Sequence, residues 1–159
     1  MIRVARVEKV TTTSLPEPLA RRILDGSPDA VVVCDPRGHV HYWNAGAERI
    51  FGFSSGEAIG ASLDLIIPQR FRERHWTGWT AVMTTGHTRY SDGQLLAVPA
   101  LHKDGRQVSI EFSIQLLANQ RGQIDWVVAV IRDVTERYNR EKALRAELKE
   151  LRLTTRGAP

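Results

Sequence analysis

Three β-prone runs follow one another in the second half of the chain, and they constrain the fold more than any other feature. Each run is rich in β-branched and aromatic residues; the runs cover residues 94–101, 107–117 and 124–132. Only short turn sequences separate them, Lys103-Asp104-Gly105 and residues 119–122. Connections of this length join antiparallel neighbours, so we predict three consecutive antiparallel strands. Pro99 favours an edge position for the first of them, because proline has no amide to donate.

The first half of the chain alternates short strand and helix patterns. The predicted elements are an entry helix over residues 16–24, strands over residues 30–34 and 40–43, short helices from Asn44 and Ser54, and a longer helix over residues 70–84. Gly86 stands where the longer helix would be capped. His75 falls on the apolar side of that helix, with Phe71 and Trp79. With the three later strands, these elements predict a single α+β domain with five strands over residues 15–135.

The two ends of the chain carry different patterns. Residues 1–14 show no helical period, and we interpret them as a flexible arm. Asp133 precedes Glu136 by three residues, as in a helix cap, and predicts a helix within residues 136–159. Leu144, Leu148 and Leu151 form a narrow apolar stripe on it among mixed charges. Such a helix is expected to pair with another helix, so we predict a homodimer.

Composition narrows the function classes. The chain has 159 residues and one cysteine, Cys34, which excludes an intrachain disulfide and a multi-cysteine metal site. No apolar run is long enough to span a membrane, and the sequence predicts a cytoplasmic protein without membrane contact. The motifs of nucleotide-binding enzymes, metalloproteases and serine hydrolases are missing, so we predict that the chain is not an enzyme. Arg70, Arg72 and Arg74 beside Trp76 are interpreted as a solvated face rather than a nucleic-acid site.

Several short motifs together resemble the PAS family over residues 27–137. They are residues 27–30, Asp35, Gly38, Asn44 with Ala45 and Ala47, residues 52–54, Glu57, Gly60, residues 103–105 and residues 132–137. The resemblance implies a five-stranded antiparallel sheet with short helices on one face and a pocket beneath them. It further implies a signal-transduction function, such as regulation of transcription, in which a bound small ligand or cofactor acts through the C-terminal helix on a dimer or a signalling partner. A ligand-free dimerisation and docking module is the alternative.

The segment around His75 is similar to the helix of haem-binding PAS oxygen sensors, on residues 74–79 and 84–86. That resemblance implies haem b, with His75 as the axial metal ligand and with Phe112 and Ile114 over the distal side of the iron. Leu95 and Leu96 occupy the neighbourhood in which those sensors carry an arginine. The alternative is an ordinary histidine satisfied on an apolar helix face.

Flavin is the less favoured cofactor. The flavin–cysteine photochemical subclass carries its cysteine in the helical part of the fold, whereas Cys34 ends the first predicted strand. A non-covalent flavin would need flat aromatic walls, for which Trp43 and Trp126 are the candidates. The expectation for both tryptophans is nevertheless a place in the core.

Overall fold

A computed structural model describes residues 15–86 and 96–156 of the chain. In chain order the elements are α1 (Glu17–Asp25), β1 (Ala30–Cys34), β2 (Val40–Trp43), α2 (Ala45–Phe51), α3 (Ser55–Ala58), the 3₁₀ helix η1 (Leu63–Leu65), α4 (Gln69–Thr85), β3 (Leu96–Leu101), β4 (Gln107–Ala118), β5 (Ile124–Asp133) and α5 (Thr135–Arg156). The predicted α+β fold is confirmed. The predicted arm over residues 1–14 lies outside the described residues.

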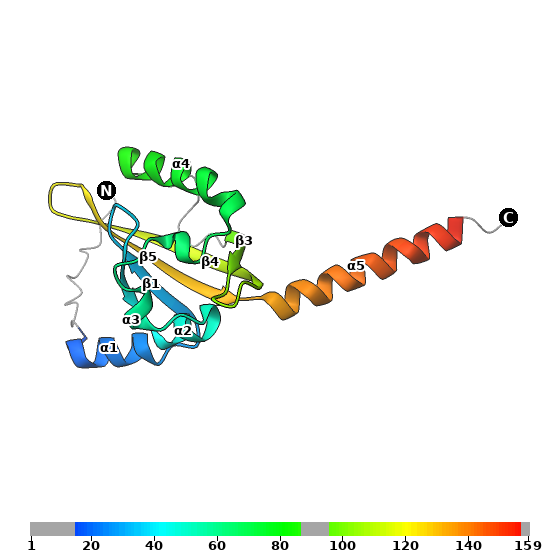
Figure 1. Cartoon of the computed structure of the whole chain (residues 1–159), viewed down its shortest axis with the longest axis horizontal. Coiled ribbons are helices and arrows are strands. Elements are labelled where there is room, and N and C mark those ends of the chain that lie inside the picture. The colour runs from blue at the N-terminus through cyan, green and yellow to red at the C-terminus, as the bar shows by residue number, and fades with distance from the viewer. Residues whose placement is uncertain (1–14, 87–95, 157–159) are drawn as a thin grey trace, which may run out of the picture.

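The five strands form one antiparallel sheet in the order β2-β1-β5-β4-β3 (Figure 1). Strands β3, β4 and β5 follow one another through tight turns, as the sequence predicts. Strands β1 and β5 also pair, although they are far apart in the sequence. Strand β3 is an edge strand, which explains why Pro99 is tolerated there.

The core lies between one face of the sheet, here called the inner face, and the helices α2 and α3. Alternate residues Ala30, Val32 and Cys34 of β1 lie on this face and are almost fully buried. Ala47, Ile50 and Phe51 of α2 belong to the same cluster. Cys34 is 2% exposed, as predicted, and burial raises the pKa of its thiol to about 12, so it stays protonated and unreactive at neutral pH.

Asn44 begins α2 and is the one buried polar side chain among the described residues. Its Oδ1 accepts the amide of Ala47 at 2.9 Å, which is the predicted helix cap, and the amide of Val31 at 2.9 Å. Its Nδ2 donates to the carbonyl oxygens of Leu24 at 2.8 Å and Asp29 at 3.1 Å. One side chain thereby joins the end of α1, β1 and α2.

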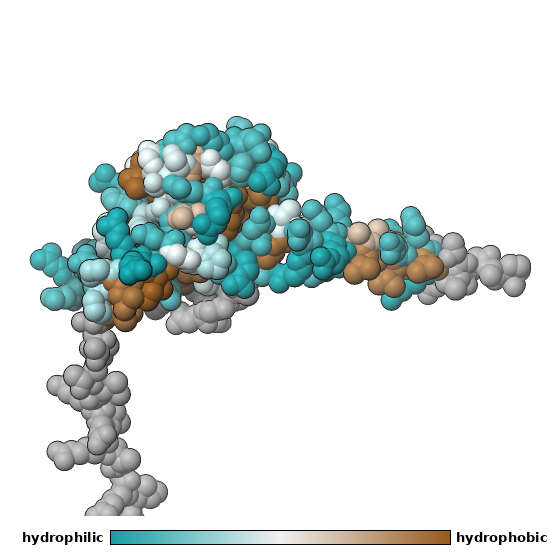
Figure 2. Space-filling view, turned by 90° about the horizontal axis from the view of Figure 1, so that it is seen from below, coloured by the Kyte–Doolittle hydropathy of each residue, from teal (hydrophilic) through white to brown (hydrophobic). Residues whose placement is uncertain are grey.

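Exposed apolar side chains include those of α1, of the sheet and of α5. On α1, Leu19 and Ile23 are exposed and the helix buries no residue. On the sheet face opposite the core, here called the outer face, Trp126 and Val130 are exposed. The leucine stripe of α5 gathers on the half of that helix far from the domain (Figure 2). No helix in the described ranges combines the length and apolar character needed to cross a membrane.

Helix α5 continues from β5 and extends away from the domain (Figure 1). The carboxylate of Asp133 accepts the amide of Thr135 at 2.8 Å, so the predicted cap is present. Thr135 Oγ1 accepts the amide of Ser109 on β4 at 2.9 Å, and the amide of Val134 donates to the Ser109 carbonyl at 2.8 Å. The first turn of α5 is therefore fixed to both β4 and β5.

Candidate functional site

Two tryptophans attach α4 to the rest of the domain. Trp76 Nε1 donates to the carboxylate of Asp64 at 2.8 Å, and Trp79 Nε1 donates to the carbonyl of Pro36 at 2.8 Å. The ring of Trp76 lies so close to Gly38 that a Cβ there would stand 2.3 Å from it. Gly38 also has φ of +80°, so the β1–β2 turn needs glycine for both its backbone conformation and this contact.

His75 lies between these anchors on the side of α4 that faces the domain. Its ring centroid is 4.8 Å from that of Trp76 and 5.7 Å from that of Trp79. The Nδ1 atom has no accessible surface and no hydrogen-bond partner within the described part of the chain. A buried polar atom without a partner is uncommon in folded proteins, and a ligand that satisfies it is one explanation.

The environment of His75 favours the neutral imidazole. Burial lowers the pKa of His75 below its usual range, and the nearby carboxylate of Asp64 only partly opposes this. At neutral pH the ring is therefore uncharged and carries a lone pair on one nitrogen. This is the form that binds a metal or accepts a hydrogen bond from a ligand.

Two of the other predicted site residues lie on the inner face, on β4. Phe112 and Ile114 are both half-buried, and in the sheet they stand opposite Ile131 and Ala129 of β5. Phe112 packs against the core cluster, as Trp79 does from α4. The structure places His75 on α4 and Phe112 and Ile114 on the inner face of β4, and their role toward a cofactor stays a prediction. Leu95 lies outside the described residues.

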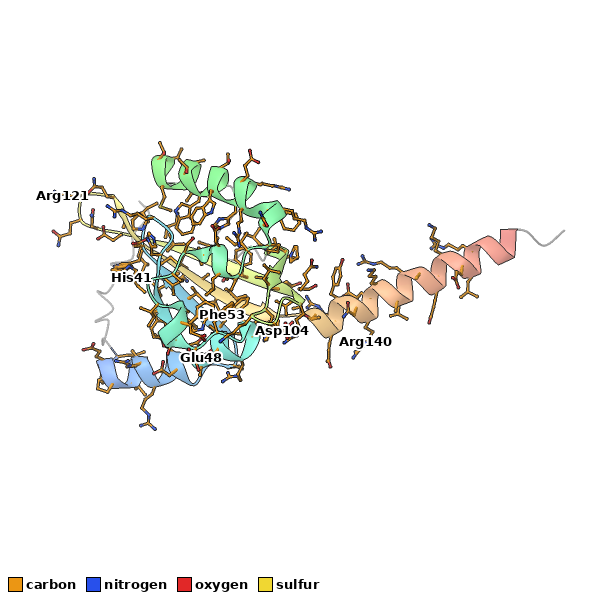
Figure 3. All side chains as sticks on the ribbon, in the orientation of Figure 1. His41, Glu48, Phe53, Asp104, Arg121 and Arg140 are labelled. Carbon is orange, nitrogen blue, oxygen red and sulfur yellow. The ribbon has the colours of Figure 1, made fainter. Side chains whose placement is uncertain are left out.

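A cavity of about 320 Å³ lies at the C-terminal end of α4. It is lined by Pro36, residues 83–86 and residues 122–124. The tip of the β4–β5 hairpin, marked by Arg121, reaches out beside this end of α4 (Figure 3). The volume is that of a small-ligand pocket, but none of the three described site residues, His75, Phe112 and Ile114, lines it. Sequence reasoning missed this cavity because three segments that are distant in the sequence form its walls. The sequence indicated only that Gly86 caps a helix and that Gly122 lies in a turn.

The place in the core expected for both tryptophans is confirmed for Trp43 and wrong for Trp126. Trp43 is 4% exposed on the inner face, where its Nε1 donates to the carbonyl of Phe53 at 3.0 Å. Trp126 is 39% exposed and lies on the outer face, one residue before the buried Val127, against the ring of His41. Side chains alternate along a strand, so adjacent residues point to opposite sides of the sheet. The two indoles cannot flank one flavin.

No group of three or more histidine, cysteine, aspartate and glutamate side chains in the described part of the chain is placed to hold a metal ion. The metal prediction for His75 therefore concerns a single imidazole, which is the ligand set that the protein supplies to haem iron in globins and peroxidases. The donor type and its neutral state fit that group.

Comparisons with known proteins agree with this geometry. A family model described as the PAS fold matches residues 24–139. The sensor protein FixL of Bradyrhizobium diazoefficiens is 30% identical over 135 residues, which cover 82% of this chain and 25% of that protein. The chain thus spans about a quarter of this curated relative.

Two solved structures show the same fold. The PAS domain of a Colwellia psychrerythraea protein has a TM-score of 0.65 at 24% identity and covers 75% of this chain and 97% of that one. A sensory box histidine kinase/response regulator from Burkholderia thailandensis has a TM-score of 0.60 at 22% identity, covering 86% of this chain and 98% of that one.

Proposed function

The chain belongs to the PAS family, and from that premise we propose that it is a sensory domain of a signalling system. A small ligand or cofactor lies between α4 and the inner face of the sheet, beside His75. Its arrival or chemical change alters the packing there, and β5 passes the change to α5. The chain binds and transmits and does not itself catalyse a reaction. Its output is the pairing of α5 with a second copy or with a signalling partner.

The buried, unpartnered Nδ1 of His75 is the observation that carries this proposal. A ligand group within hydrogen-bonding or coordination distance would give its lone pair or proton a partner. Leaving a buried polar group unsatisfied costs about 1–3 kcal/mol, so a site that is complete with its ligand explains the arrangement. The neighbouring rings of Trp76 and Trp79 are held by their own hydrogen bonds and keep the imidazole in place.

The path from this site to α5 is short. Ala129 packs against the core on β5, four residues before the end of that strand at Asp133. Only Val134 separates Asp133 from the first residue of α5, and Val134 is itself buried. A displacement of β5 therefore moves the first turn of the helix, because no flexible linker absorbs it.

The test compares the purified chain with two histidine variants by native mass spectrometry and absorption spectroscopy. His75→Gln removes the proposed ligand-binding group, whereas His39→Gln changes an exposed histidine outside the site. We expect a bound small molecule in the wild type and in His39→Gln, with loss of occupancy of at least about tenfold in His75→Gln, since one strong polar contact is worth about 1.4 kcal/mol or more. An empty wild-type chain, or equal occupancy in all three, would favour the ligand-free docking module.

Haem is the ligand class that a specific observation favours. The neutral imidazole of His75 fits an axial ligand, and FixL, a sensor by name, matches 82% of this chain. His75 would hold the iron through one ring nitrogen, and Phe112 and Ile114 would contact the opposite side. Haem supplies an iron centre that binds diatomic gases or changes redox state. Reconstitution with hemin should give a Soret band in the wild type that shifts or disappears in His75→Gln, and an identical band in both would remove His75 from the account.

A further inference from the structure

Charges of alternating sign follow one another in a row from the α1–β1 turn to α5, joined by ion pairs except between Arg132 and Glu111, which are neighbours in the sheet. Arg132 on β5 donates to both carboxylate oxygens of Asp29, through Nε at 3.0 Å and Nη2 at 2.7 Å. On the outer face Arg132 stands opposite Glu111 of β4, and Glu111 pairs with Arg137 in the first turns of α5. The row continues along the helix from Arg137 to Glu141 at 3.9 Å and on to Arg145 at 3.3 Å.

The members of the row influence one another electrostatically. The pKa of Asp29 is lowered mainly by its hydrogen bond from Arg132, and the pKa of Arg132 is raised by Asp29 first and by Glu111 as well. Asp29 is also held from the backbone, because its carbonyl accepts Asn44 Nδ2, which donates to the end of α1 as well. The row thus begins at a rigid junction and ends on α5.

The same stripe of α5 carries the row and the exposed leucines. Val134, Arg137, Glu141, Leu144, Leu148 and Leu151 follow at alternating spacings of three and four residues. That spacing places them on one side of a helix. The stripe is buried at Val134, charged where it meets Glu111, and apolar from Leu144 onward, where the leucines are 52–63% exposed. Whatever sets the rotation of the helix at Arg137 therefore also sets the direction in which the leucines face.

We infer that the row Asp29, Arg132, Glu111, Arg137, Glu141 and Arg145 fixes the direction and rotation of α5 on the sheet, and so aims the leucine stripe. Exposed ion pairs are individually weak, and salt screens them over about 10 Å at 0.1 M and about 3 Å at 1 M. The row therefore sets the position of α5 and adds little to the stability of the fold. This inference rests on the proposed function only in taking α5 as the output, and its geometry needs no ligand.

The test measures intrachain distances between two spin labels by double electron–electron resonance. Spin labels at Gln115→Cys on the exposed outer face and Lys149→Cys on α5, in a Cys34→Ala background, report the orientation of the helix. Dilution with unlabelled chain confines the signal to one copy. The variants are Glu111→Gln, Arg137→Gln and the double variant. Arg106→Gln is the control, because Arg106 is as exposed as Arg137 and its ion pair with Asp104, at 3.2 Å, lies outside the row.

We expect one narrow distance distribution for the parent and for Arg106→Gln at low salt. Each single row variant should broaden the distance distribution about twofold. The double variant should broaden it no further than either single variant does. In 1 M salt, the distribution of the parent should reach the same width. Unchanged widths in both single variants, additive broadening in the double variant, or an equal effect of Arg106→Gln would overturn the inference. The salt titration uses the parent alone, so it decides the matter even if a variant folds poorly. All widths are compared in the chain without added ligand, so a failure to bind ligand does not decide this test.

Discussion

Asn44 shows what a single residue contributes to this fold. The sequence predicts its role as a helix cap, because asparagine before a helical pattern commonly accepts an amide of the first turn. The hydrogen bonds of Nδ2 to Leu24 and Asp29 could not be predicted, since they depend on how α1 returns to the start of β1. The place of His75 on the apolar side of α4 follows from periodicity, and Phe112 and Ile114 follow from the family resemblance. The exposed outer-face position of Trp126 follows from neither, because an apolar residue in a strand fits either side.

Replacing Asn44 with alanine should destabilise the domain strongly. The variant leaves two amides and two carbonyls without their partner inside the protein, and each unsatisfied buried group costs about 1–3 kcal/mol. We expect the free energy of unfolding in urea to fall by at least about 2 kcal/mol. Asn139→Ala, on the exposed side of α5, is the control and should change it by less than about 0.5 kcal/mol. Similar values for the two variants would show that Asn44 is not a junction.

The pair Asp29–Arg132 predicts a pH-dependent stability difference. The pKa of Asp29 is lowered in the fold, so the pair contributes fully above the unfolded value of about 3.9 and loses its contribution as the pH falls through the folded value. The stability gap between wild type and Arg132→Gln should therefore be larger at pH 7 than below pH 4. Arg21→Gln, which breaks the exposed pair with Asp25 at 3.7 Å, is the control for the loss of one exposed arginine. A gap that does not change with pH would contradict the assignment.

At the scale of elements, short-range patterns were sufficient for most boundaries. The predicted helix over residues 70–84 corresponds to α4, and the strands over residues 30–34 and 40–43 match β1 and β2. Contacts between segments that are distant in the sequence could not be predicted. Arg132 and Asp29 are 103 positions apart, and the cavity at the end of α4 needs the β4–β5 hairpin beside it. Neither is visible in local composition.

The junction of β5 and α5 allows a test of the cap. Asp133→Ala removes the carboxylate that accepts the amide and the hydroxyl of Thr135, at 2.8 Å and 2.6 Å. Loss of a helix cap costs about 1 kcal/mol, so the unfolding free energy should fall by roughly that amount. Hydrogen exchange should also become faster in the first turn of α5. Asp133→Asn, which keeps an acceptor oxygen, should lose less, and equal losses in both variants would contradict the capping role.

At the scale of the whole molecule, the exposed apolar residues on α1, the outer face and α5 predict self-association. Pairing of two leucine stripes removes apolar surface from water, and each Å² so buried stabilises the dimer by about 25 cal/mol. Sedimentation velocity should show a dimer for the whole chain and weaker association for residues 1–135. Leu148→Glu should raise the dissociation constant at least tenfold, whereas Ala146→Glu, about 200° around the helix, should leave it nearly unchanged. A monomer at all concentrations would rule out the homodimer.

Coupling between the His75 site and α5 is the central claim of this account. The measurement that tests it most directly is hydrogen exchange of the amides of α5, with and without hemin, in the wild type and in His75→Gln. The account predicts that hemin changes exchange in the first turns of α5 as well as around α4 in the wild type, and in neither place in His75→Gln. Hemin that binds through His75 without altering exchange in α5, or a change in α5 that persists in His75→Gln, would contradict it.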